Sequence, residues 1–157
     1  MLDFSQMLFR LVVALALGIL IGIERELAGK EAGIRTAMMV AGGSALFAMI
    51  GVSLPYLVAL SPEGLTEVIA RNAGYLDVIA NIVIGIGFIG AGIIIKTEEH
   101  VHGLTTAAVI WTTAAVGTAA GLGLLKFALV ATAIISGLLY ILRIFGVSER
   151  INSGVRH

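Results

Sequence analysis

The sequence predicts an all-α protein, a polytopic membrane bundle of five transmembrane helices with one short interfacial helix. Of its 157 residues, 59% are hydrophobic and 13% are charged, which is about half the charged share of a typical soluble domain. With a mean hydropathy of +1.05, a soluble fold of this size could not cover its surface with polar groups. Five apolar runs each approach the roughly 20 residues that cross a bilayer, and they lie near residues 4–23, 37–54, 77–95, 104–122 and 125–145.

The first run contains one charge, Arg10. It lies about 9 Å along a helix axis from Phe4, and a charge at that depth is a functional candidate because it is costly to place there. Gly18 and Gly22, four residues apart, give the helix a smooth face for a neighbouring helix. The following segment, Glu24 to Arg35, reads ERELAGKEAGIR and predicts a charged loop.

The second run ends before a loop that Pro55 and Pro62 bracket. Ser61, Pro62 and Glu63 form a plausible helix start, with serine as the cap and proline in the first turn. The apolar residues that follow recur at helical spacing. The sequence therefore predicts a short helix over residues 63–73 that lies on the membrane surface.

The third and fourth runs are rich in small residues, which allow close helix contact inside a membrane. Gly85-x-Gly87-x-x-Gly90 matches a dinucleotide-binding pattern, but that pattern requires a preceding strand and an acidic residue about 20 positions later. Here the apolar run simply continues, so we interpret the glycines as helix packing. The same role is expected for Gly92, Gly117 and Gly121.

Basic residues favour an outside N-terminus and a cytoplasmic tail over residues 146–157, because positive charge collects on the cytoplasmic side. Seven basic residues then lie inside and two, Arg71 and Lys126, lie outside. The seven are Arg25, Lys30, Arg35, Lys96, Arg143, Arg150 and Arg156.

Asp77 and Asn81 are expected at nearly the same depth as Arg10, in the outer part of the third helix. Asp77 could cap that helix, since a carboxylate favours a helix N-terminus. An amide such as Asn81 usually bonds to a neighbouring membrane helix. We predict that Arg10 bonds to Asp77, to Asn81 or to both, because a charge at this depth needs an acceptor.

Several function classes are disfavoured by the sequence. The formal net charge is zero, which argues against nucleic-acid binding. Cysteine is absent, and no nucleophile has an adjacent base, so no enzymatic constellation is visible. Glu98, Glu99, His100 and His102 are expected in a solvated hairpin, although two carboxylates could touch magnesium weakly.

Four motifs in order resemble the MgtC/SapB family of bacterial membrane proteins. Glu24 and Arg25 close a first-helix motif that begins at Arg10. Ala32-Gly33-Ile34-Arg35-Thr36 resembles the second motif. Gly85 to Gly92 resembles the third, and Gly103-Leu104-Thr105-Thr106-Ala107-Ala108 with Trp111 resembles the fourth. The resemblance favours specific roles for Glu24, Arg25 and Arg35. Further polar candidates are Arg10, Thr36, Thr105 and Thr106; the hydroxyls of Thr105 and Thr106 can bond to their own helix or bridge to another.

The chain departs from the family pattern at two places. The family usually carries Asp-Pro-x-Arg and then Gln at the start of the third helix, where this chain has Gly74 to Asp77 and then Asn81. Many members also carry a soluble domain after the last helix, and this chain is expected to lack it.

The resemblance implies a bacterial cytoplasmic membrane protein linked to growth at low magnesium and to survival of intracellular pathogens. It favours a non-enzymatic regulator, with the membrane ATP synthase as a candidate partner. The alternative is a transporter or channel for magnesium or another cation. Separately, the small-residue faces of three helices leave a homodimer open, and a purely structural assembly protein is a third reading. No cofactor is expected, and magnesium is the one ion that the resemblance leaves open. Transport sites typically contain ionisable groups deep within a membrane span. No carboxylate of this chain is expected at such a depth.

Overall fold

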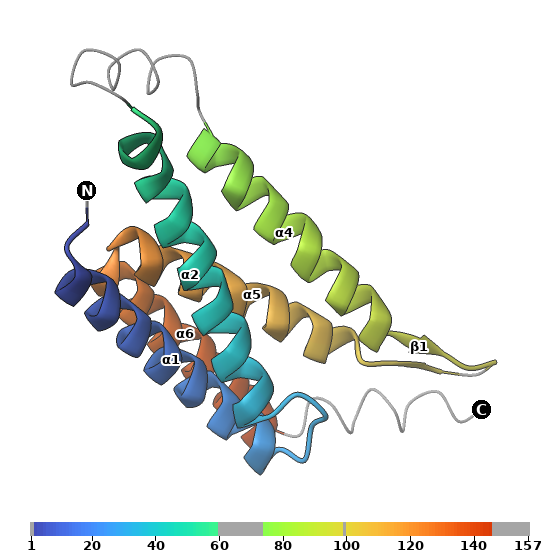
Figure 1. The fold of residues 1–157 in the computed structure, drawn as a ribbon. Helices are drawn as coiled ribbons and strands as arrows, with labels where there is room; N and C mark the ends of the chain where they lie inside the picture. The colour runs from blue at the N-terminus through green and yellow to red at the C-terminus, as the bar shows by residue number, and fades with distance from the viewer. Residues whose placement is uncertain (1, 60–73, 99, 146–157) are drawn as a thin grey trace.

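The computed structural model describes residues 2–59, 74–98 and 100–145, and it confirms the all-helical class. Five helices carry most of this part of the chain: α1 (Phe4–Leu27), α2 (Ile34–Val58), α4 (Gly74–Ile93), α5 (Leu104–Leu122) and α6 (Leu125–Ile144). α1, α4 and α6 run in one direction, and α2 and α5 run in the other (Figure 1). Between α4 and α5, strands β1 (Ile95–Lys96) and β2 (Val101–His102) pair antiparallel.

Four of these helices are long and apolar enough to cross a membrane, namely α1, α2, α5 and α6. The apolar part of α4, Asp77–Ile93, is shorter. The chain is thus a multi-pass helical membrane protein, and a fifth span remains a prediction. The surface helix expected over residues 63–73 and the tail after residue 145 lie outside the described residues.

Three helices differ by two or more residues from their expected ends. α4 begins at Gly74 instead of residue 77 and ends at Ile93 instead of residue 95, because strand β1 starts at Ile95. α1 continues a turn past residue 23, through Glu24–Leu27, because glutamate, arginine and leucine are good helix formers. It stops before Gly29, whose φ of +64° suits glycine. α2 continues past Pro55 to Val58, so the expectation that Pro55 opens the loop was wrong; membrane helices tolerate proline where other groups satisfy the freed carbonyl.

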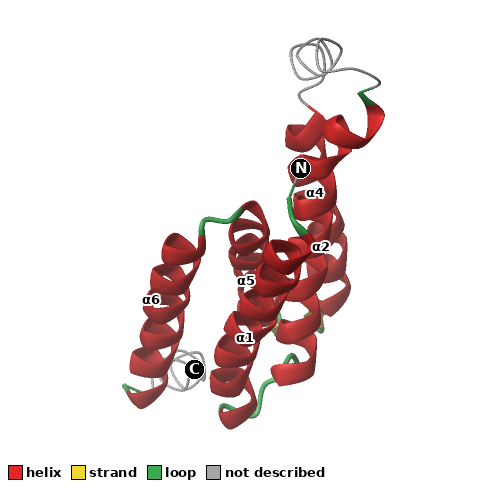
Figure 2. Ribbon diagram, turned by 60° about the vertical axis from the view of Figure 1, so that its left-hand side comes forward, coloured by secondary structure: helices red, strands yellow, loops and turns green. Residues whose placement is uncertain are grey.

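α5 lies at the centre of the bundle. Its apolar span is 61% buried, whereas that of α6 is 11% buried. Figure 2 shows α6 at one edge and α4 near the other, with α1 and α5 between them. The main core joins small and branched side chains from four helices, namely Ala14, Ile21, Ala45, Val116, Ala120 and Ala128.

Four of the expected packing glycines bring helix backbones together. A methyl group at Gly18 would lie 2.6 Å from Ala37 O, and one at Gly22 would lie 2.5 Å from Ile34 Cα. One at Gly121 would lie 2.5 Å from Ala45 O, and one at Gly117 would overlap the Ala41 carbonyl. α2 is therefore held between α1 and α5, at a separation that a larger side chain would prevent.

Candidate functional site

The last turn of α1 carries two adjacent charged side chains that are buried. Glu24 is 8% exposed and Arg25 is 3% exposed. The prediction that a charged loop begins at Glu24 was therefore wrong, since Glu24 and Arg25 belong to α1 and are buried. A buried charge is costly unless it is paired or hydrogen-bonded, so the surroundings of this pair decide what it can do.

Arg25 reaches across to the first turn of α5. Its Nη2 donates to Oγ1 of Thr106 at 3.2 Å, and Thr106 is itself 5% exposed. α5 can begin there because Gly103 adopts φ +82° and lies directly against the backbone of Ile93, where a side chain would collide. The bond joins residues that are far apart in sequence, and it fixes the end of α1 to the start of α5.

Two atoms of this cluster lack partners. Oε2 of Glu24 and Nε of Arg25 are buried and form no hydrogen bond among the described residues. Oε2 of Glu24 can accept a hydrogen bond and Nε of Arg25 can donate one, so one acceptor and one donor remain unused at this site. Unsatisfied buried polar atoms are uncommon in native proteins. This makes Glu24, Arg25 and Thr106 the strongest candidate functional site in the described chain.

A second carboxylate in the last turn of α1, Glu26, has a structural role. Oε2 of Glu26 accepts a hydrogen bond from the backbone N–H of Ile34 at 2.9 Å. An anion at a helix N-terminus satisfies a free donor and complements the helix dipole. Glu26 was not singled out from the sequence, because no cap signature links residues eight positions apart. Arg35 is exposed and Thr36 is partly exposed, both in the first turn of α2.

Arg10 has a different partner from the one expected. Its Nη1 donates to the backbone carbonyl of Gly121 at 2.9 Å, near the end of α5. The predicted bond to Asp77 or Asn81 was wrong, since both are exposed on α4, which packs chiefly on α5 and α2. The last carbonyls of a helix have no intrahelical donor, so α5 offers Arg10 an acceptor at the same level.

Space for the Arg10 guanidinium comes from Gly123. This residue ends α5 with φ +91°, and a methyl group on it would lie 2.7 Å from Nη2 of Arg10. Any larger residue at position 123 would adopt a strained backbone and also displace the arginine. Arg10 therefore joins α1 to the end of α5, whereas Arg25 joins α1 to its beginning.

The remaining predicted residues divide between packing and open surface. Gly90 contacts Ala107 of α5, with 3.5 Å between its built methyl position and Ala107 Cβ, whereas Gly85, Gly87 and Gly92 have open space above them. Thr105 is exposed beside the buried Thr106.

No described group of three or more histidine, aspartate or glutamate side chains is arranged to hold a metal ion. The β1–β2 hairpin is exposed at Glu98, His100 and His102. Oγ1 of Thr97 donates to the carbonyl of His100 at 3.0 Å and closes its turn. The described part of the hairpin is thus a solvent-facing turn, stabilised by hydrogen bonds between Thr97 and His100.

A family model and several related proteins indicate the same family for this chain. The MgtC family model matches residues 11–147. Protein SrpB of Synechococcus elongatus is 40% identical over 138 residues, covering 83% of this chain and 71% of SrpB. Protein MgtC of Salmonella typhimurium is 39% identical over 128 residues, covering 82% of this chain and 48% of MgtC.

A third relative is named "Putative magnesium transporter YhiD", from Escherichia coli. It is 38% identical over 123 residues, which cover 76% of this chain and 53% of YhiD. The chain therefore spans about half the length of YhiD and of MgtC. No solved structure matches it. The family match over residues 11–147 extends across nearly all of the described helices, and the chain belongs to the MgtC family.

Proposed function

We propose that this chain is a non-enzymatic membrane protein that regulates a partner membrane protein when magnesium is limiting. One observation carries the proposal: acidic residues occur in the five described helices only in the last turn of α1 and the first turn of α4. A transport path for a cation usually contains ionisable groups near the middle of the membrane. The buried Glu24, Arg25 and Thr106 instead suit a structural junction that keeps one surface in shape for a partner.

The membrane ATP synthase is the partner that we propose, from the family resemblance. The test uses inverted membrane vesicles from cells with and without this chain, in which ATP-driven proton pumping is followed with a pH-sensitive dye. The expected result is slower pumping when the chain is present, with unchanged passive proton leak. Equal pumping rates at matched amounts of ATP synthase would contradict the proposal.

Magnesium transport is the second candidate, and a specific observation favours it. Glu24 has a buried carboxylate oxygen without a described partner, and magnesium prefers oxygen ligands. One relative also carries a transporter name. Proteoliposomes that contain a magnesium-sensitive dye would test this directly. Saturable uptake that is lost in Glu24→Gln would establish transport, and no uptake above empty liposomes would favour the regulator.

The charge distribution supports one orientation of the chain. We propose that it lies in the bacterial cytoplasmic membrane with its N-terminus outside, because seven basic residues then lie inside and two lie outside. A reporter enzyme that works only outside the membrane, fused after His157, is expected to be inactive. A fusion that is active outside would reverse the orientation.

A further inference from the structure

A long groove lies between α2 and α4. Its volume of about 700 Å³ is within the range of sites that bind small molecules. No charged side chain of the described residues lines it. The lining is almost wholly apolar and comes from both helices, including Met39, Val40, Phe47, Val78, Ile82 and Ile89. Because the groove lies between membrane helices, its lining suits an uncharged molecule that enters from the bilayer.

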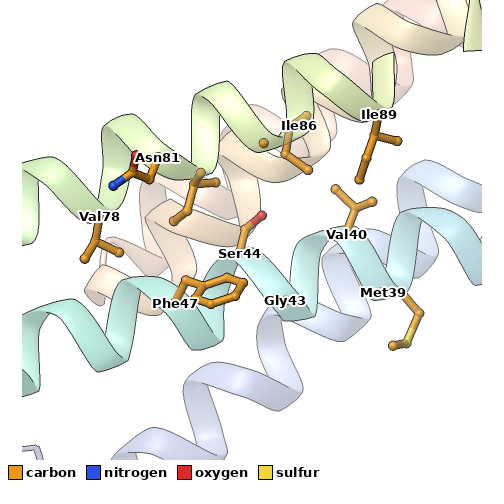
Figure 3. A pocket seen from close by; sticks show the side chains of 11 residues that line it. Met39, Val40, Gly43, Ser44, Phe47, Val78, Asn81, Ile86 and Ile89 are labelled. Carbon is orange, nitrogen blue, oxygen red and sulfur yellow. The ribbon is translucent and has the colours of Figure 1, made fainter. Parts of the chain in front are cut away.

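Two polar side chains line the groove from opposite sides, Ser44 from α2 and Asn81 from α4 (Figure 3). Ser44 is only 4% exposed, and its oxygen points toward the groove. Neither side chain has a hydrogen-bond partner among the described residues. Buried polar groups without a partner are uncommon, and the hydrocarbon of a membrane offers no water to replace one. The two side chains therefore indicate an occupant that carries hydrogen-bonding atoms of its own.

Both polar side chains lie near the middle of their helices. Ser44 is about 3 Å along the axis from the middle of α2. Asn81, expected nearer the outer end, is about 4 Å from the middle of α4, because this helix begins at Gly74. α2 is long and apolar enough to cross the membrane, so its middle lies deep in the hydrocarbon core. The polar groups of phospholipids lie outside that core. The occupant must instead carry its polar atoms within the hydrocarbon.

We propose that the α2–α4 groove binds the head group of an isoprenoid quinone, with Ser44 and Asn81 donating hydrogen bonds to its two carbonyl oxygens. A quinone is uncharged, and its long apolar tail keeps it in the hydrocarbon core. Its carbonyls accept hydrogen bonds at opposite edges of a planar ring, which matches donors on opposite sides of the groove.

The groove also has room for a flat ring. Gly43 and Gly85 belong to its lining, and nothing lies within 4 Å of their built methyl positions. Phe47, one turn after Ser44 on α2, adds an aromatic ring on which a quinone can stack. This inference rests on the membrane location of the helices and not on the regulatory function proposed above.

Photolabelling of the protein in proteoliposomes tests the site. The probe is a photoreactive benzoquinone with a short alkyl tail, and mass spectrometry identifies the labelled peptides. Saturable labelling of groove residues on α2 or α4 is expected, and the unlabelled quinone should compete for it. An alkylbenzene with the same tail lacks the carbonyls and should compete about tenfold less well. Equal competition by both compounds would mean that any acyl chain fills the groove, and it would overturn the proposal, as would labelling only outside the groove.

Filling the groove should prevent labelling. Gly85→Leu places a side chain in the groove and is expected to abolish saturable labelling. Gly87→Leu is the matched control, because Gly87 also lies on α4 with open space above it but does not line the groove. Labelling should persist in Gly87→Leu. Melting temperatures of both variants are measured in parallel, and equal labelling of two folded variants would overturn the proposal.

A smaller change tests the hydrogen bond, and it decides the outcome if a leucine variant does not fold. Ser44→Ala removes one donor and should weaken quinone binding about two- to tenfold in the competition assay. Ser136→Ala is the matched control, since it removes a buried hydroxyl on α6, away from the groove. It should leave quinone binding unchanged. Equal affinities of the two serine variants would overturn the proposal.

Discussion

Arg25 on the last turn of α1 donates to Thr106 on the first turn of α5, with 3.2 Å between Nη2 and Oγ1. Both residues are almost completely buried, so water cannot readily replace either partner. The bond joins the end of the first helix to the start of the central helix. Nε of Arg25 and Oε2 of Glu24 are buried and have no hydrogen-bond partner among the described residues.

Replacing Thr106 by valine should destabilise the protein. Valine keeps the shape of threonine but leaves another Arg25 donor unsatisfied, which typically costs about 1–3 kcal/mol of unfolding free energy. Thermal unfolding in detergent is the measurement, and Thr106→Ser should restore most of the loss. Thr118→Val is the matched control, because Thr118 is also buried on α5 but donates to Ala114 O of its own helix. An equal loss in both variants would mean that the Arg25 bond contributes little.

Glu24 and Arg25 should be energetically coupled. Arg25→Met alone leaves the buried Glu24 carboxylate without the positive charge of the adjacent residue, and an uncompensated buried charge is strongly destabilising. Glu24→Gln removes the charge and should cost less. The double variant Glu24→Gln, Arg25→Met should therefore be more stable than the sum of the single losses predicts. A double-mutant cycle from thermal or denaturant unfolding measures the coupling, and strict additivity would contradict it.

Apolar runs were sufficient to predict the helices, because membrane helices need about 20 apolar residues whatever they pack against. Glycines at spacing four also pointed correctly to close packing at Gly18, Gly22, Gly117 and Gly121. The sequence could not say which helix each glycine would meet. Which helix each glycine contacts depends on the fold, and both glycine pairs pack against α2.

Polar partners were much harder to predict than helices. A charged run such as Glu24 to Arg35 is typical of a loop, and the partner of Arg25 lies 81 positions away. Arg10 bonds to a backbone carbonyl, which every residue possesses, so no side-chain pattern could point to Gly121. Asp77 was the carboxylate at the expected depth, but it lies on α4, which does not pack mainly on α1.

Glycine substitutions should separate the packed glycines from the open ones. Gly117→Val would drive a side chain into the Ala41 backbone, where no side-chain rotation can relieve the overlap. Overpacking of this kind typically costs about 1–3 kcal/mol and occasionally more. Gly87→Val is the matched control, since nothing lies within 4 Å of its built methyl position. Monodisperse protein after size-exclusion chromatography is expected only for Gly87→Val, and a well-folded Gly117→Val would contradict the close contact of α5 with α2.

Arg10 and Asp77 should act independently. Arg10→Met removes the hydrogen bond from Arg10 Nη1 to the carbonyl oxygen of Gly121. This loss should lower the unfolding free energy by about 1–3 kcal/mol. Asp77→Asn changes an exposed residue on α4 and should have a smaller effect. Because the two side chains share no partner, their effects should add to within about 0.5 kcal/mol in a double-mutant cycle. A Gly123→Ala variant should lose at least as much stability as Arg10→Met, because its methyl group would displace the guanidinium and its backbone would be strained at φ +91°. If the double variant lost clearly less than the sum, Arg10 would be bonded to Asp77 after all.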